Sequence, residues 1–311
     1  MKYTLEWNNA LSDFQAFLRL EKSLSENSVD AYTNDIKKLI EYVEIKNIEI
    51  IPEKIKLNHL QDFLVWINEF GISQRSQARL ISGIKAFYKY FLLEDKIKTD
   101  PTKLLESPRI GFKLPEVLTI EEIDELIDAI DLSTFEGHRN KAIIETLYSC
   151  GLRVSELVNL KKSNLYFQQN FIKVEGKGSK ERLVPISETA KKQINLYLKN
   201  VRNIQIVEGD NHDFVFLNNK GKKISRVMVF IIIKKLAELI GLKKNISPHT
   251  FRHSFASHLV EGGADLRAVQ EMLGHESIIT TEIYTHLDLD YMRDTILSFH
   301  PRTRKKYDNQ L

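Results

Sequence analysis

A chain of 311 residues with 42% hydrophobic and 28% charged residues is long enough for about two globular domains, and its net charge of only +3 does not by itself indicate a polyanionic partner. No apolar run approaches the roughly 20 residues that span a membrane, and the N-terminus lacks the pattern of a signal peptide, so we expect a cytoplasmic protein with no membrane partner. The single cysteine, Cys150, excludes an internal disulfide framework and a cysteine-rich zinc site.

Four helices are predicted in the first hundred residues, around 8–23, 28–43, 57–70 and 75–95. In the second of them the apolar residues recur on one helical face: Tyr32, Ile36, Leu39, Ile40 and Val43. Residues that break regular structure follow these helices: Pro101, Pro108, Gly111 and Pro115. We therefore predict an all-helical N-terminal domain over 1–107 and a linker over 108–116.

The second part of the chain, 117–311, is predicted to be a mainly helical domain with a small β-sheet and a polar C-terminal tail. Thr119, with a glutamate three residues later, forms a capping box that begins a helix. A second helix is predicted over about 139–150 and is ended by Gly151. The stretch "FIKVEGKGSKERLVPI" (171–186) predicts a β-hairpin, because apolar and β-branched residues flank a glycine-rich turn.

The stretch "SPHTFRHSFASHL" (247–259) places three histidines and an arginine in one predicted helix, with Ser247 as its N-cap and Pro248 as its first residue. Glycines at 262 and 263 end this helix. One of its faces groups polar and small residues: His249, Arg252, His253 and Ala256. An adjacent apolar stripe is predicted to dock the helix into the core: Phe251, Phe255, His258 and Leu259.

This segment alone leaves three interpretations of His249 and Arg252 open. In a zinc site His249 and His253 would be ligands four residues apart, but position 250 is threonine where a zinc hydrolase needs a glutamate base. A solvated charged face is the simplest interpretation. An anion site is the third, because a helix N-terminus offers free N–H groups and the planar guanidinium of arginine suits a phosphate.

Three further segments carry residues that could share a site with this helix. Arg153 lies in "GLRVSEL", just after a glycine-terminated helix, and Glu156 could orient it through a salt bridge. Lys177 lies at the tip of the predicted hairpin, where it could reach over a ligand. His275 follows a glycine, and Tyr284 comes nine residues later. An arginine pair, a lysine and a tyrosine are the groups that a metal-free phosphoryl transfer requires.

In chain order these segments give Arg, Lys, His-x-x-Arg, His and Tyr, and their local sequences resemble the tyrosine recombinase (phage integrase) family. The resemblance rests on "GLRVSEL", "GKGSKERLVPI", "HTFRHSFASHL" and "LGHESIITTEIYTHL", and it covers nearly all of the chain. It implies a SAM-like core-binding domain that clamps DNA, followed by a mixed α/β catalytic domain. The two-domain layout and the ending "SFHPR" (298–302) are most similar to the Xer branch, which resolves chromosome dimers.

The resemblance also implies a role for each of six residues, with no metal, cofactor or ATP. Tyr284 would be the nucleophile that forms a 3′-phosphotyrosyl bond with DNA, and Arg153 and Arg252 would hold the phosphate. Three residues would assist: Lys177 as general acid, His249 as acid/base partner of the nucleophile, and His275 as a hydrogen-bond partner of the phosphate.

The partners implied by the resemblance are a double-stranded DNA recombination site and three further protomers, either identical copies or a paralogous recombinase. A septal DNA translocase could control the reaction, as in many Xer systems. Two alternatives are a mobile-element integrase with the same chemistry and a DNA-binding protein that has lost catalysis. We expect no additional N-terminal arm-binding domain, which disfavours the first, and the intact set of six residues disfavours the second.

Context assigns three of four neighbouring residues. Tyr291 is the only serious rival nucleophile, but its surroundings do not match the motif. His258 is predicted to be a core histidine and Cys150 to be packed in the core, whereas the role of His253 stays undecided.

Overall fold

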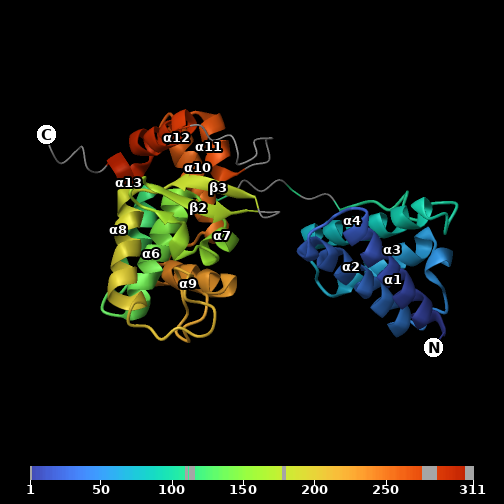
Figure 1. Ribbon diagram of the computed structural model, residues 1–311. Helices are drawn as coiled ribbons and strands as arrows, with labels where there is room; N and C mark the ends of the chain where they lie inside the picture. The colour runs from blue at the N-terminus through green and yellow to red at the C-terminus, as the bar shows by residue number, and fades with distance from the viewer. Residues whose placement is uncertain (1, 109–110, 112–115, 177–179, 275–285, 305–311) are drawn as a thin grey trace. The chain divides into compact units, whose positions relative to one another are not determined.

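The computed structural model (Figure 1) describes residues 2–108, 111, 116–176, 180–274 and 286–304. The chain divides into two compact units, Met1–Lys113 and Leu114–Leu311, each with its own hydrophobic core. No helix within these described ranges is both long and apolar enough to cross a membrane.

The first unit contains four long helices, as predicted, and the short 3₁₀ helix η1: α1 (Lys2–Leu20), α2 (Glu26–Ile45), η1 (Pro52–Lys54), α3 (Leu57–Glu69) and α4 (Gln74–Leu93). Helix α1 begins well before the predicted start near residue 8. The reason is Trp7, whose ring is buried and whose indole N–H donates to the carbonyl of Ile50 at 3.0 Å. This anchor extends the helix over residues 2–7, which carry no clear periodicity.

Helices α2 and α4 pack closely because a glycine on α4 faces a buried carboxylate on α2. Asp35 is buried on α2, and the Arg79 guanidinium donates to its two carboxylate oxygens at 2.6 and 2.8 Å. A Cβ at Gly83 would lie 2.6 Å from Asp35 Oδ2, so only glycine fits at this contact. Burial raises the pKa of Asp35, and the charge of Arg79 partly offsets that rise.

The second unit is mainly helical with one small sheet, which confirms the predicted fold class. Its helices are α5 (Ile120–Asp128), α6 (Phe135–Cys150), α7 (Val154–Val158), η2 (Lys162–Asn164), α8 (Glu188–Tyr197), the π-helical turn η4 (Leu198–Arg202), α9 (Arg226–Leu239), α10 (Pro248–Glu261), α11 (Leu266–Leu273), α12 (His286–Phe299) and α13 (Pro301–Arg304).

Two helix starts in this unit are set by threonine caps. The predicted capping box is present, with Thr119 Oγ1 accepting from the Glu122 N–H at 3.2 Å and the Glu122 carboxylate accepting from the Thr119 N–H at 2.8 Å. Helix α6 begins earlier than predicted, because Thr134 Oγ1 accepts from the Gly137 N–H at 3.0 Å and so supplies the N-cap.

The sheet has three antiparallel strands in the order β1 (Leu165–Tyr166), β2 (Phe171–Glu175) and β3 (Glu181–Pro185). Strands β2 and β3 form the predicted hairpin, with Phe171 paired to Pro185 and Glu175 paired to Glu181. The sequence did not indicate β1, because two residues are too short to show an alternating pattern.

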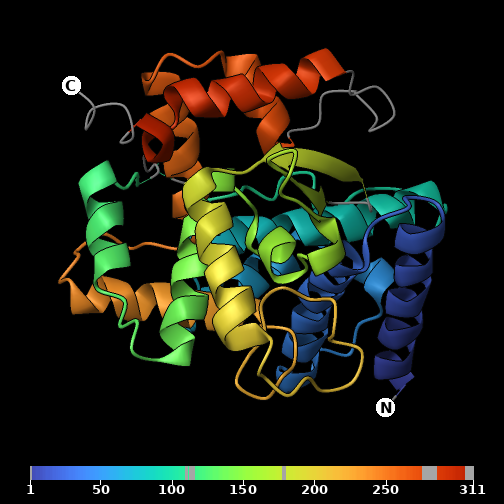
Figure 2. The same cartoon turned by 60° about the vertical axis from the view of Figure 1, so that its left-hand side comes forward.

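Helix α6 occupies the core of the second unit, and all residues from Ala142 to Cys150 are buried. It packs against α8 and α10. Figures 1 and 2 show α12 lying across one end of this unit, where it contacts α10, α11 and β3. The predicted site residues lie on these elements or next to them in the sequence.

The segment "SFHPR" fastens the end of α12 and α13 to the unit's own helices. Arg302 forms ion pairs with Asp124 on α5 and with Glu145 on α6, the latter at 3.2 Å. Its guanidinium also lies over the ring of Tyr148, 5.6 Å from the centroid. His300 is fully buried, with its ring centroid 4.8 Å from that of Tyr148.

Candidate active site

Arg252 is held inside the second unit by α10, which begins at Pro248 as predicted. The Ser247 N–H donates to Thr250 Oγ1 at 3.1 Å and fixes this helix start. Arg252 is 5% exposed, and it donates to the carbonyl of Gly151 at 2.7 Å and to that of Leu273. Burial and the neighbouring arginines lower the pKa of Arg252 to about 10, so the guanidinium remains a cation at neutral pH.

Arg153 is placed by the turn between α6 and α7. Gly151 ends α6 with a left-handed φ of 57°, a conformation that favours glycine. A Cβ at this position would also lie only 2.4 Å from Phe255 Cδ1, so a larger residue would clash. Arg153 then precedes α7, and its Nη1 donates to Glu156 Oε1 at 2.9 Å. Its backbone N–H donates to the same carboxylate at 2.8 Å. This confirms the predicted salt bridge.

Arg182 was not predicted as a site residue, yet it is the closest partner of Glu156. It lies on β3 with 7% exposure, and its two terminal nitrogens donate to the two Glu156 carboxylate oxygens at 2.7 and 2.9 Å. The two arginines together lower the pKa of Glu156, although burial opposes them and is the largest single influence. The signal that could have found Arg182 is an arginine at an inward-facing strand position, where an apolar residue is the rule.

Three arginines bind the last three carbonyls around the end of α11. Arg182 Nε donates to Met272 at 3.0 Å and Arg153 Nη2 to Gly274 at 3.1 Å, while Arg252 binds Leu273 between them. These carbonyls have no partner within the helix, and the negative end of the helix dipole favours cations there. The cluster therefore fixes the residue that directly precedes His275.

Of the six predicted site residues, the structure brings Arg153 and Arg252 to this common point. His249 is exposed on the first turn of α10, one turn before Arg252. The other three, Lys177, His275 and Tyr284, lie outside the described residues. The arrangement of three guanidiniums around a single carboxylate leaves a net positive charge, which suits a phosphate.

The four residues that neighbour the predicted site residues differ in burial. His258 is buried, with its Nδ1 2.8 Å from the Tyr148 hydroxyl, which confirms the prediction of a core histidine. Cys150 is buried in the core, as predicted. Tyr291 is 52% exposed on α12, and His253 is partly exposed on α10. Among the described residues, no cluster of three or more His, Cys, Asp and Glu side chains could hold a metal ion.

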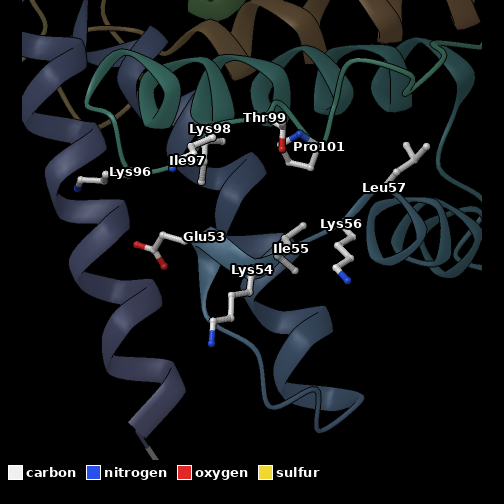
Figure 3. Close-up of a pocket in the computed structure, with 10 residues that line it drawn as sticks. All are labelled: Glu53, Lys54, Ile55, Lys56, Leu57, Lys96, Ile97, Lys98, Thr99 and Pro101. Atoms are coloured by element: carbon white, nitrogen blue, oxygen red, sulfur yellow. The ribbon is translucent and has the colours of Figure 1, made fainter.

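A separate basic hollow of about 580 Å³ lies in the first unit (Figure 3). It is formed where η1 meets the segment after α4, and its lining includes Lys54, Lys56, Lys96 and Lys98. Lys96 is already engaged, because it donates to Asp13 at 2.9 Å and to the Tyr90 hydroxyl at 3.2 Å. Figure 3 shows the ammonium groups of Lys54 and Lys56 pointing away from the segment after α4.

Comparison with known proteins identifies the family to which the chain belongs. The profile of the phage integrase family matches residues 116–290, and that of the phage integrase N-terminal SAM-like domain matches residues 11–95. The chain therefore belongs to the phage integrase family, the tyrosine recombinases.

Its relatives show that the chain is a tyrosine recombinase of the Xer type. Tyrosine recombinase XerD of Chlorobaculum tepidum is 42% identical over 300 residues, covering 95% of this chain and 97% of that protein. Tyrosine recombinase XerD of Listeria innocua is 40% identical over 295 residues, with 95% and 99% covered. These matches confirm the predicted enzyme class, a DNA recombinase of the Xer type, and do not favour the two alternatives.

Solved structures show the same fold. The XerH site-specific recombinase bound to its difH substrate, in a pre-cleavage complex, matches with a TM-score of 0.64 and 25% identity, covering 85% of this chain and 78% of that one. The Tn1549 transposon integrase in complex with circular intermediate DNA matches with a TM-score of 0.69 and 20% identity, covering 91% and 94%.

Proposed function

We propose that this recombinase cuts and rejoins double-stranded DNA at a specific chromosomal site, and that it resolves chromosome dimers at cell division. The observation that carries the proposal is the convergence of Arg153 and Arg252 at the end of α11. A guanidinium has five N–H donors, and the carbonyls and Glu156 use only some of them. The remaining donors are available for the two non-bridging oxygens of a phosphate.

In the proposed reaction the Tyr284 hydroxyl attacks the phosphorus, its proton passes to His249, and the bond from phosphorus to the 5′ oxygen breaks. Lys177 gives a proton to the departing 5′ oxygen, and His275 donates a hydrogen bond to the phosphate. The phosphotyrosyl bond keeps the energy of the broken linkage, so a 5′-hydroxyl from another strand can displace Tyr284 and reseal the DNA without ATP. The two arginines stabilise the charge that develops on phosphorus, which removes the need for a metal ion.

The two domains would have separate functions, DNA binding and catalysis. Residues 1–107 would bind DNA as the core-binding domain, 108–116 would link the domains, and 117–311 would carry the chemistry and the C-terminal tail. The XerH site-specific recombinase is bound to its difH substrate in the solved structure, which supports a DNA recombination site as the partner of this chain. We propose a cytoplasmic tetramer on two duplexes, formed by this chain alone or with a paralogous recombinase, and control by a septal DNA translocase.

The test is covalent trapping on a nicked suicide substrate that carries a candidate chromosomal recombination site. Wild-type protein should form a covalent complex, whereas Tyr284→Phe should bind the DNA without forming one. Tyr291→Phe is the matched control, since Tyr291 lies on the next helix and is exposed. If Tyr284→Phe still trapped DNA and Tyr291→Phe did not, the assignment of the nucleophile would be wrong.

A further inference from the structure

Arg182 occupies a position that joins three parts of the site. Its guanidinium binds both oxygens of Glu156, its Nε–H binds the Met272 carbonyl, and 93% of its surface is covered, since it is 7% exposed. All three guanidinium nitrogens of Arg182 already donate to protein groups, whereas Arg252 donates through Nη1 and Nη2. The contribution of Arg182 must therefore act through the groups that it holds.

Two glycines lie close to Arg182, and each directly precedes a predicted catalytic residue. A Cβ on Gly176 would be 3.7 Å from Arg182 Nη1, and the Gly176 N–H closes the hairpin by donating to the Lys180 carbonyl at 2.7 Å. A Cβ on Gly274, which has φ of +65°, would be 3.1 Å from the Arg182 guanidinium carbon. The Arg182 side chain thus lies near both the last described residue before Lys177 and the last before His275.

Arg182 also determines how Glu156 is shared. The carboxylate is buried and accepts from Arg182 and from Arg153, whose side chain is 38% exposed. With Arg182 present, a buried cation balances the carboxylate, so Arg153 keeps net positive charge toward solvent. Without Arg182, the negative charge of Glu156 would be paired with Arg153 and would neutralise its positive charge.

We propose that Arg182 is a positioning residue for DNA cleavage, which places the hairpin that carries Lys177 relative to Arg153 and Arg252. The inference rests on the proposed function, in which Lys177 is the general acid. Arginine is needed because a planar fork can bind the carboxylate through two bonds and still reach the Met272 carbonyl with its third nitrogen. A lysine would keep the charge and lose this geometry.

The test measures single-turnover cleavage of two suicide substrates at saturating DNA, one normal and one with sulfur in place of the bridging 5′ oxygen. A thiol has a pKa of only about 8.5, so its thiolate leaves without a general acid. Arg182→Met should lose about 100-fold in rate on the normal substrate, the scale expected for a misplaced catalytic group. The loss on the sulfur substrate should be at least about tenfold smaller, since that substrate does not need Lys177.

Two further variants keep the test decisive. Arg182→Lys retains a cation beside Glu156 and should show the same difference between substrates even if Arg182→Met folds poorly. Arg202→Met is the matched control, because Arg202 is another buried arginine of this unit that binds carbonyls, those of Asn211, His212 and Phe214. It should affect both substrates equally.

The outcomes separate the inference from the proposed function. Equal losses on the two substrates for Arg182→Lys and Arg182→Met, or undiminished cleavage of the normal one, would overturn the positioning role while leaving the recombinase activity standing. Failure of the wild-type protein to cleave either substrate would overturn the proposed function and this inference together.

Discussion

Acid should destabilise the second unit through His300, which is fully buried. Its Nδ1 accepts from the Arg302 N–H at 3.2 Å, and its Nε2 has no hydrogen-bond partner among the described residues. Burial, followed by the charges of Arg302 and His258, lowers the pKa of His300 to about 3, against 6.5 in the unfolded chain, although the nearby backbone of Tyr148 partly opposes this. Protonation therefore favours the unfolded chain.

The magnitude follows from linkage. Between pH 6.5 and pH 3 the unfolded chain binds a proton that the folded one does not, so stability falls as the pH falls through this window. Lowering the pH from 7 to 5 should reduce the free energy of unfolding by about 2 kcal/mol through His300 alone. Burial also lowers the pKa of His258, which acts in the same direction, whereas burial raises the pKa of Glu145, which acts in the opposite one.

The single cysteine provides an assay specific to this unit. Cys150 is buried in α6 and becomes reactive only when the second unit opens, whereas both tryptophans, Trp7 and Trp66, lie in the first unit. Urea unfolding would be followed by labelling Cys150 with an aromatic disulfide reagent that reacts at acidic pH. His300→Leu should lose about 2 kcal/mol of the wild-type pH dependence. An unchanged pH dependence in this variant would refute the reasoning.

Three further changes test the packing. Gly83→Ala should destabilise the first unit by about 1–3 kcal/mol in a tryptophan-fluorescence unfolding curve, because the new Cβ would meet the carboxylate of Asp35. Gly151→Ala should destabilise the second unit by more than about 1 kcal/mol and slow DNA cleavage, since the methyl group would strike Phe255 at a left-handed residue. Thr119→Ala should lower the stability of the second unit by about 1 kcal/mol through loss of its cap, as measured by cysteine protection.

Each of these three predictions has an outcome that would contradict it. A Gly83→Ala protein as stable as the wild type would mean that α2 and α4 do not approach as closely as described. Normal cleavage by Gly151→Ala would show that the turn before Arg153 does not set the position of the guanidinium. An unchanged unfolding curve for Thr119→Ala would show that the capping box contributes nothing measurable.

The local features of the fold could be predicted because they depend on neighbouring residues. Helical periodicity located the four helices of the first unit, and the capping box at Thr119 and the hairpin over 171–186 were confirmed. The start of α1 could not be predicted, because Trp7 is anchored by a carbonyl 43 residues away in the sequence. The residues of the first turn give no sign of such a contact.

The site was predictable to the extent that its residues lie in recognisable segments. The pairing of Arg153 with Glu156 is local and followed from their spacing. Arg182 could not be identified in this way, because its partners lie 26 and 90 residues away and it follows the more conspicuous lysines of "GKGSKER". Likewise, Gly151 was recognisable as a helix stop, but its close approach to Phe255 is a tertiary contact.

The measurement that tests the central claim most directly is the identification of the amino acid linked to DNA. Wild-type protein would be incubated in EDTA with a suicide substrate, the covalent complex digested with protease, and the DNA-bearing peptide mapped by mass spectrometry. The proposed stabilisation of the phosphate by Arg153 and Arg252 predicts that the complex forms without metal, and the proposed nucleophile predicts that the adduct is a phosphotyrosine at Tyr284. An adduct at Tyr291 or at any other residue, or a strict requirement for added metal, would contradict the account.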